Sequence, residues 1–136
     1  MQFLPQLIAA MMMVESGGDP AAVGDGGRAL GCLQIHDGIV QDVNRRYGAS
    51  YKHKDALNPL LAPYICKLYL TMYAPQDATP EICARIWNGG PRGHMTGATV
   101  KYWNKVRAKL EKNGQYRLKL ARLRQRTTPW QERNGE

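Results

Sequence analysis

Residues 11–35 read MMMVESGGDPAAVGDGGRALGCLQI. In this stretch an apolar run ends at Glu15, and six glycines follow within residues 16–31. So many glycines exclude a helix, because each one adopts left-handed backbone angles readily and weakens a helix by about 1 kcal/mol. The pattern therefore predicts a helix that stops just after Glu15, followed by an irregular glycine-rich loop or a short β-hairpin.

The residues before Glu15 predict that first helix. They resemble the apolar part of a signal peptide, but a basic leading region and a small-residue cleavage site are missing, so we interpret them as part of the folded domain. Apolar residues recur at helical spacing on one expected buried face. That face consists of Phe3, Leu7, Ala10, Met11 and Val14.

Further helices are expected downstream. Asp37 is placed to cap a helix that ends at Gly48, with Val40, Val43 and Tyr47 on one face. The next helix opens at residues 58–59 or at residues 62–63, where two prolines leave both starts open. Its core face consists of Ile65, Leu68, Tyr69 and Met72.

The last third of the chain also follows helical patterns. Thr79 and Pro80 form an N-cap and first-turn signal for a helix that stops at residues 88–91. A fifth helix is expected over residues 99–112, with Trp103 in the core and Asn113-Gly114 closing it. A separate basic helix over residues 115–126 and a frayed end are expected to follow.

Length and composition limit the class of protein. The chain has 136 residues, of which 43% are hydrophobic and 22% charged, as in a soluble globular protein with one core. These values exclude a disordered, collagenous or coiled-coil chain.

The three cysteines are expected to be free buried thiols, with a single disulfide as the alternative, and we expect no metal and no cofactor. The cysteines are Cys32, Cys66 and Cys83.

The net charge of +8 is concentrated at one end. Residues 1–100 contain eight basic and eight acidic residues, whereas residues 101–136 contain eleven and three. A basic segment favours a polyanionic partner, such as nucleic acid, acidic lipid or an acidic wall polymer, and charge alone does not choose among them.

Glu15 is the first candidate for catalysis. Burial at the end of an apolar helix, together with the negative end of the helix dipole, would raise its pKa. A protonated carboxyl can act as a general acid on the oxygen of a glycosidic bond. The competing interpretation is a solvated glutamate at a helix end.

Asp25 supplies a second carboxylate from the glycine-rich segment. Glycoside hydrolysis uses two carboxyl groups, one in an apolar setting and one in a polar setting. The sequence Gly-Asp-Gly-Gly is also ordinary turn chemistry, so a turn-forming role for Asp25 stays open.

Two blocks of sequence resemble the lysozyme-like superfamily. Val14-Glu15-Ser16-Gly17 with Gly31-Cys32-Leu33-Gln34-Ile35 is similar to a signature shared by soluble lytic transglycosylases, goose-type lysozymes and invertebrate-type lysozymes. The block from Ala84 to Gly93, with Thr99 and residues 101–106, is similar to one in invertebrate-type lysozymes. Together the blocks cover roughly residues 8–110.

The resemblance implies a mainly α, lysozyme-like domain that cleaves the MurNAc-β-1,4-GlcNAc bond of peptidoglycan. It implies a catalytic domain over residues 1–114 and a basic C-terminal extension over residues 115–136. Glu15 matches the catalytic acid, and Asp25 lies near the position of a second catalytic carboxylate. The expected substrate-binding residues are Ser16, Gln34, His36, Trp87, Asn88, Gly89, Gly90 and Tyr102.

The resemblance also implies where the protein acts. Its partner would be the glycan strands of peptidoglycan, in the periplasm or outside the cell, and we expect a monomer. Few cysteines suggest a bacterial or phage member. Because no signal peptide is recognised, we expect either a phage enzyme released by a membrane-permeabilising protein or a domain trimmed from a larger secreted chain.

Three alternatives stay open from the sequence. The first is a lytic transglycosylase, in which the C6 hydroxyl of the sugar attacks and a 1,6-anhydro end forms. The second, of another class, is a basic nucleic-acid or surface-binding module built on residues 101–126, although no specific nucleic-acid motif is present. The third is a degenerate lysozyme that binds glycan without cutting it.

Overall fold

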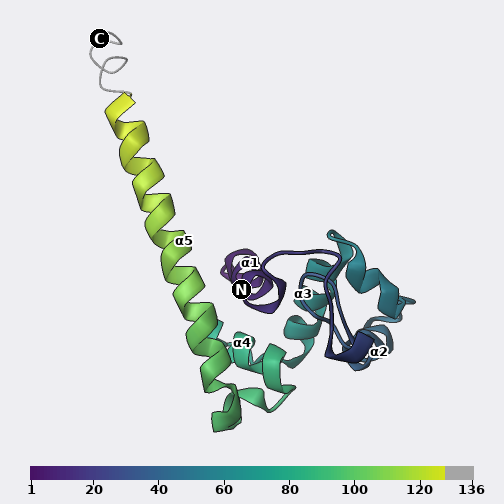
Figure 1. Cartoon of the computed structure of the whole chain (residues 1–136). Helices are drawn as coiled ribbons and strands as arrows, with labels where there is room; N and C mark the ends of the chain where they lie inside the picture. The colour runs from purple at the N-terminus through teal and green to yellow at the C-terminus, as the bar shows by residue number, and fades with distance from the viewer. Residues whose placement is uncertain (128–136) are drawn as a thin grey trace.

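The computed structural model describes residues 1–127. It contains five α-helices and one small antiparallel sheet in this part of the chain, so the expected mainly α fold is confirmed. The expected frayed end, residues 128–136, lies outside the described residues. Figure 1 shows the helices as a body on one side and the long helix α5 on the other.

The first helix, α1, spans Leu4–Ser16. It stops where the sequence predicted, because Gly17 adopts the left-handed conformation at φ 67° and its N–H donates to the carbonyl of Met13. Phe3 and Val14 are only half-buried, whereas Leu4 and Ile8 are buried with Leu7. The buried face is therefore rotated slightly from the one expected.

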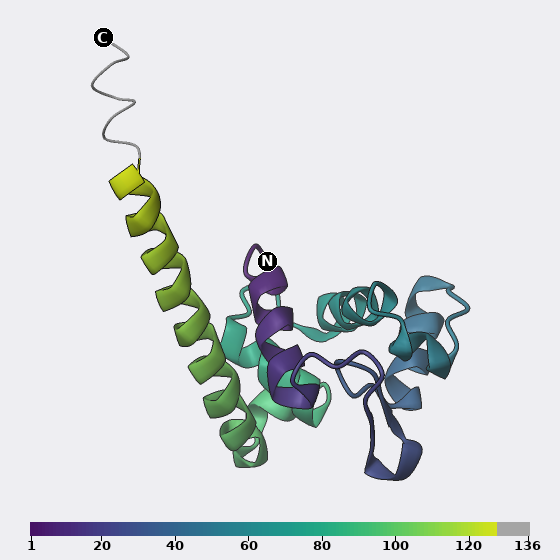
Figure 2. The same ribbon diagram turned by 45° about the horizontal axis from the view of Figure 1, so that its top comes forward.

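The glycine-rich segment folds into a short hairpin. Strands β1 (Val23–Gly24) and β2 (Ala29–Leu30) pair antiparallel, with Val23 opposite Leu30, and a 3₁₀ turn over Asp25–Gly27 joins them. Figure 2 shows this hairpin projecting from the helical body. Of the two expected forms, the structure therefore has the hairpin.

Two helices follow the hairpin. Helix α2 spans Asp37–Tyr47 and ends at the left-handed Gly48, as predicted, although its N-cap is His36 and Asp37 lies in the first turn. After a 3₁₀ turn over His53–Leu57, helix α3 spans Leu61–Tyr73. The start of α3 falls between the two starts that the prolines allowed.

The remaining helices are α4 (Pro80–Gly89) and α5 (Val100–Thr127), joined through 3₁₀ turns over Gly93–Met95 and Gly97–Thr99. The N-cap at α4 is confirmed, since Oγ1 of Thr79 accepts from the N–H of Ile82 over 3.2 Å.

The expected break at Asn113-Gly114 is wrong. Helix α5 continues through both residues, so residues 99–112 and 115–126 do not form separate helices. A glycine inside a helix costs only about 1 kcal/mol, and the Leu, Lys and Arg residues on both sides are good helix formers. Nothing in this region holds Gly114 in the left-handed conformation that would stop the helix.

The core lies between the helices of the body. Helix α1 contacts α3, α4 and α5, and α2 packs on α3. All three cysteines are free and buried, which agrees with the expectation of buried thiols. Trp103 is half-buried against the core, at its edge. Within residues 1–127, no helix combines the length and the apolar character that crossing a bilayer would require.

Candidate active site

A cleft of about 360 Å³ lies where the end of α1, the hairpin, the start of α2 and the end of α4 meet. Four of its lining residues were predicted as site residues besides Glu15, and two were not. The lining residues are Glu15, Ala29, Gln34, His36, Ile39, Trp87 and Asn88. Two sequence blocks far apart in the chain are thereby brought to one cleft.

Glu15 is the acid of this cleft. It occupies the last turn of α1, just before the left-handed Gly17 turns the chain away. Burial raises the pKa of its carboxyl to about 7, because an ionised carboxylate loses hydration there. The group is therefore largely protonated in mildly acidic solution, as a general acid must be.

Tyr102 is not among the residues that line this cleft, but it lies near enough to Glu15 for the charge of that carboxyl to act on its hydroxyl. Its side chain is buried on the first turn of α5, and burial together with the charge of Glu15 raises the pKa of its hydroxyl strongly. Among the described residues, its hydroxyl has no hydrogen-bond partner. A buried donor without a partner is uncommon in folded proteins.

The end of α4 supplies two more lining residues. Trp87 is buried and packs edge-on against Tyr69, with ring centroids 5.6 Å apart, so its indole is fixed. Asn88, the next residue, is exposed and faces the cleft. Its amide can both donate to and accept from sugar hydroxyl and acetamido groups.

Gln34 connects the cleft to the hairpin. Its Nε2 donates to the carbonyls of Gly31 and Ala22, over 3.0 and 3.3 Å, while its backbone adopts the uncommon φ of 50°. A Cβ on Gly24 would lie 2.2 Å from its Oε1, so a larger residue at position 24 would displace the end of the Gln34 side chain. Gln34 therefore braces the hairpin as well as lining the cleft.

Asp25 lies at the hairpin turn, outside the residues that line this cleft. Its carboxylate is 3.4 Å from Nη2 of Arg28 and 3.4 Å from Nε2 of His36, and half of its side chain is exposed. His36 lines the cleft and also a neighbouring hollow of about 320 Å³ that includes Arg28. His36 thus links Asp25 to the cleft.

Ser16, Gly89 and Gly90 do not line the cleft. The hydroxyl of Ser16 donates to the carbonyl of Cys32 over 2.8 Å, which ties α1 to the segment after the hairpin. A Cβ on Gly89 would lie 2.6 Å from Cγ2 of Thr99. Gly90 ends α4 at φ 86°. In these positions the three residues shape the backbone around the cleft.

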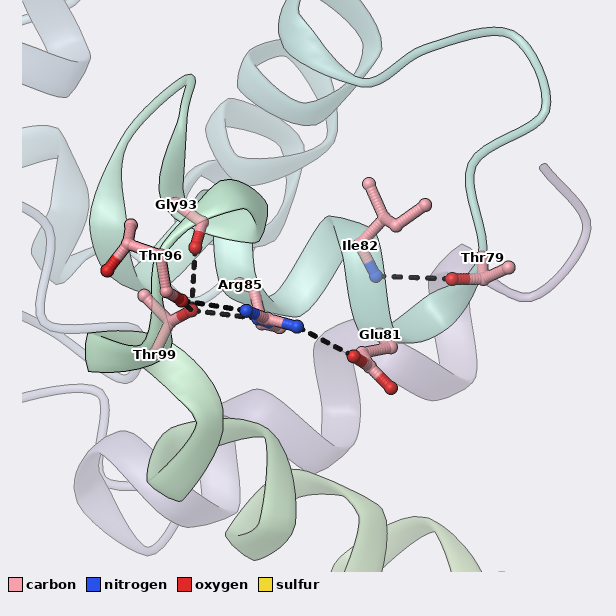
Figure 3. A network of polar contacts seen from close by, with 7 residues as sticks. All are labelled: Thr79, Glu81, Ile82, Arg85, Gly93, Thr96 and Thr99. Carbon is pink, nitrogen blue, oxygen red and sulfur yellow. Dashed lines mark hydrogen bonds and ion pairs between the residues drawn. The ribbon is translucent and has the colours of Figure 1, made fainter.

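A polar network holds α4 against the 3₁₀ turns that lead into α5 (Figure 3). The guanidinium of Arg85 pairs with Glu81 over 2.8 Å and donates to Oγ1 of Thr99 and to the carbonyl of Thr96. The hydroxyl of Thr99 donates to the carbonyl of Gly93 over 2.7 Å. Arg85, Gly93 and Thr99, which belong to the second of the two family-like sequence blocks, therefore stabilise the fold.

Sequence reasoning missed two residues of the cleft, Ala29 and Ile39. Ala29 belongs to β2, and Ile39 lies beside, not on, the buried face expected for α2. Neither carries a chemical group that could mark it in the sequence. Only the meeting of the hairpin with α2 places them in the lining.

A second, larger hollow of about 520 Å³ lies between α1 and α3. Its lining is mostly apolar, with Leu4, Ile8 and Tyr64 among its residues, and contains no carboxyl group. The smaller cleft with Glu15 is therefore the candidate active site. Within residues 1–127, no cluster of His, Cys, Asp or Glu is arranged to hold a metal ion.

The helical fold, the hairpin after the first helix and the buried glutamate at the cleft define a lysozyme-like protein. The family model of the transglycosylase SLT domain matches residues 1–109. The chain therefore belongs to the transglycosylase SLT domain family. It is an enzyme of the glycosidase or lytic transglycosylase class, and the substrate of that class is peptidoglycan.

Two curated relatives agree with this assignment. A lysozyme from Meretrix lusoria is 34% identical over 84 residues, which cover 60% of this chain and 67% of the relative. A lysozyme from Magallana gigas is 33% identical over 81 residues, which cover 57% of this chain and 58% of the relative. Comparison with solved structures gives no match.

Proposed function

We propose that the protein is a muramidase that hydrolyses the β-1,4 bond between N-acetylmuramic acid and N-acetylglucosamine, with Glu15 as the general acid. The observation that carries the proposal is the carboxyl of Glu15, whose pKa is raised to about 7 in a cleft lined by amide and aromatic side chains. A protonated acid beside hydrogen-bonding groups suits a glycan strand.

The reaction follows from this placement. Glu15 gives its proton to the bridging oxygen, the bond from that oxygen to the muramyl C1 breaks, and positive charge develops on the ring. Water then adds to C1 and loses a proton to the Glu15 carboxylate, which restores the acid. The products are a new reducing end and a free 4-hydroxyl.

Asp25 is proposed as the second carboxylate. On the hairpin its carboxylate contacts Arg28 and His36, and its negative charge would stabilise the cationic transition state or orient water. The substitution Asp25→Asn tests this role, because it removes the charge and keeps the shape.

The remaining predicted residues receive proposed roles from where they lie. We assign direct contacts with the sugar to Gln34, His36, Trp87 and Asn88, which line the cleft. Tyr102 would donate its hydroxyl to a group beside Glu15. For Ser16, Gly89 and Gly90 we propose that they act by shaping the backbone.

One observation favours a second candidate, the lytic transglycosylase. Asp25 does not belong to the lining of the Glu15 cleft. If Asp25 acts on no reacting atom, Glu15 alone can protonate the bridging oxygen, and the C6 hydroxyl of the muramyl residue closes the 1,6-anhydro ring. In that route Asp25 would be a residue of the hairpin turn only.

Mass spectrometry of digested peptidoglycan separates the two routes. The muramidase proposal expects reducing N-acetylmuramic acid ends and at least about a tenfold loss of rate in Asp25→Asn. Anhydro ends, with Asp25→Asn as active as the parent, would establish the transglycosylase instead. Glu15→Gln serves as the inactive reference in both cases.

The proposed setting and organisation follow the same logic. The substrate places the site of action at the cell wall, in the periplasm or outside the cell, and we propose that the enzyme acts there as a monomer. We also propose that residues 1–114 carry the cleft and its core, since Val106 is the last buried residue of α5 within residues 100–125. The origin as a phage enzyme is consistent with these proposals.

A further inference from the structure

The second half of α5 extends beyond the body of the protein. Figures 1 and 2 both show it leaving α1 and α4 and continuing alone. Every residue from 111 to 125 is exposed. This part of the helix therefore contributes neither to the cleft nor to the hairpin nor to the core.

The apolar residues of this segment form a stripe. Tyr116, Leu120 and Leu123 are four and three residues apart, so they fall within about 60° of one another around the helix. Their exposed fractions are 64%, 38% and 47%. We call these three residues the apolar stripe.

Basic residues lie on both sides of the apolar stripe. At about 100° per residue, Arg117 and Arg124 fall on one side and Lys112 and Lys119 on the other. Residues 112–127 contain six Lys or Arg and no Asp or Glu. Such flanking cations can extend to phosphate groups while the stripe between them is covered by apolar groups.

We propose that residues 112–127 bind the surface of an anionic phospholipid membrane, with α5 lying in the plane of the interface. The positive charge is complementary to the lipid phosphates, and the apolar stripe has the orientation needed to enter the boundary between headgroups and acyl chains. A soluble polyanion, such as nucleic acid or a wall polymer, would use the charge and leave the stripe uncovered.

Vesicle sedimentation with the full chain tests this inference without any glycan. The parent is expected to bind vesicles that contain phosphatidylglycerol at least about tenfold more tightly than vesicles of phosphatidylcholine alone. Leu120→Ser with Leu123→Ser is expected to weaken that binding by at least about tenfold, because the apolar area that enters the interface is lost.

A matched control lies on the opposite face of the same helix. Leu118, which is 60% exposed, and Ala121 both point away from the apolar stripe. Leu118→Ser with Ala121→Ser makes the same number of substitutions in the same turns and is expected to bind vesicles as the parent does. Circular dichroism would establish that both double variants keep their helix.

Three results would overturn the inference. The first is no binding of the parent to phosphatidylglycerol vesicles. The second is equal binding by the stripe variant and the opposite-face variant. The third is binding to soluble polyphosphate as tight as to vesicles and unaffected in the stripe variant, which would identify a general polyanion surface. Digestion of cell walls is measured separately, so failure here leaves the proposed reaction untouched.

Discussion

Arg85 and Thr99 connect helix α4 to the 3₁₀ turn that leads into α5. Nε of Arg85 donates to Oγ1 of Thr99 over 2.9 Å, and the same hydroxyl donates to the carbonyl of Gly93 over 2.7 Å. Arg85 lies two residues before Trp87 on α4, and Thr99 lies three residues before Tyr102 on α5. The pair therefore holds the end of α4, which carries Trp87, against the start of α5, which carries Tyr102.

Replacing Thr99 with valine should weaken this connection with little change in shape. The substitution removes the hydrogen bonds of a buried hydroxyl to Arg85, Gly93 and Thr96, and we expect it to lower the free energy of unfolding by about 1–3 kcal/mol. Urea unfolding measures the loss. Thr71→Val is the control, since Thr71 is exposed on α3 and bonds only within its own helix. Equal losses in both variants would contradict a special role for Thr99.

Gly93 should tolerate no side chain. A Cβ at this position would lie 2.0 Å from the carbonyl oxygen of Arg85, so Gly93→Ala must displace the backbone of α4. We expect a loss of about 3 kcal/mol or more in stability. Gly97→Ala is the control, since a Cβ there meets nothing within 4 Å. Thermal unfolding of the two variants side by side would refute this account if their midpoints agreed.

Glu15→Gln should abolish catalysis without harming the fold. Glutamine keeps the size of the side chain but has no proton to give to the glycosidic oxygen, so we expect a fall in rate of about 10²–10⁴-fold. Clearing of a cell-wall suspension measures the rate. A variant that retains more than a tenth of the parent activity would remove Glu15 from the mechanism.

The pH dependence of stability should reveal the buried acid. The pKa of Glu15 is about 4.5 in the unfolded chain and is raised to about 7 in the folded protein. The folded protein therefore has its full stability below about pH 4.5, where the carboxyl is protonated in both states, and loses stability as pH rises through 7. We therefore expect Glu15→Gln to gain stability over the parent between pH 5 and pH 8, by about 2–3 kcal/mol at most. A pH-independent difference between the two proteins would mean that the carboxyl is not desolvated.

Activity should fall over the same range. As pH rises through about 7, Glu15 loses the proton that it must donate, so the rate is expected to decline on the alkaline side. The rate against pH, measured on soluble wall fragments at constant ionic strength, gives the midpoint. A rate that stays constant to pH 9 would be incompatible with Glu15 as the acid.

Tyr102→Phe should separate stability from catalysis. Since the hydroxyl has no partner among the described residues, its removal is expected to leave stability unchanged or to raise it by up to about 1 kcal/mol. If the hydroxyl donates to a bound group, the rate falls although the fold does not suffer. Unfolding and wall digestion measured on the same preparation decide this, and an unchanged rate would confine Tyr102 to packing.

Local chemistry explains which features could be predicted from the sequence. The end of α1 after Glu15 follows from two adjacent glycines, and the start of α4 follows from Thr79 and Pro80. Both signals act within one helical turn. The fold class and the family resemblance rest on such local patterns and are confirmed.

The features that were missed depend on contacts across the chain. Gly114 carries a stop signal, but no element packs there to hold the left-handed turn, so the helix continues. The contacts of Arg85 depend on Thr96 and Thr99, which lie 11 and 14 residues further along the chain. The lining position of Ile39 depends on how the hairpin meets α2, which periodicity along one helix does not encode.

The continuity of α5 has a mechanical consequence. Helix α5 is one continuous rod of 28 residues, about 42 Å long, that runs from the turns after α4 to the exposed segment beyond the body of the protein. A flexible joint at residues 113–114 would let the body of the enzyme rotate relative to a bound end of α5. Because the helix is continuous, a bound end of α5 determines both the distance of the candidate cleft from the binding surface and the direction in which the cleft opens.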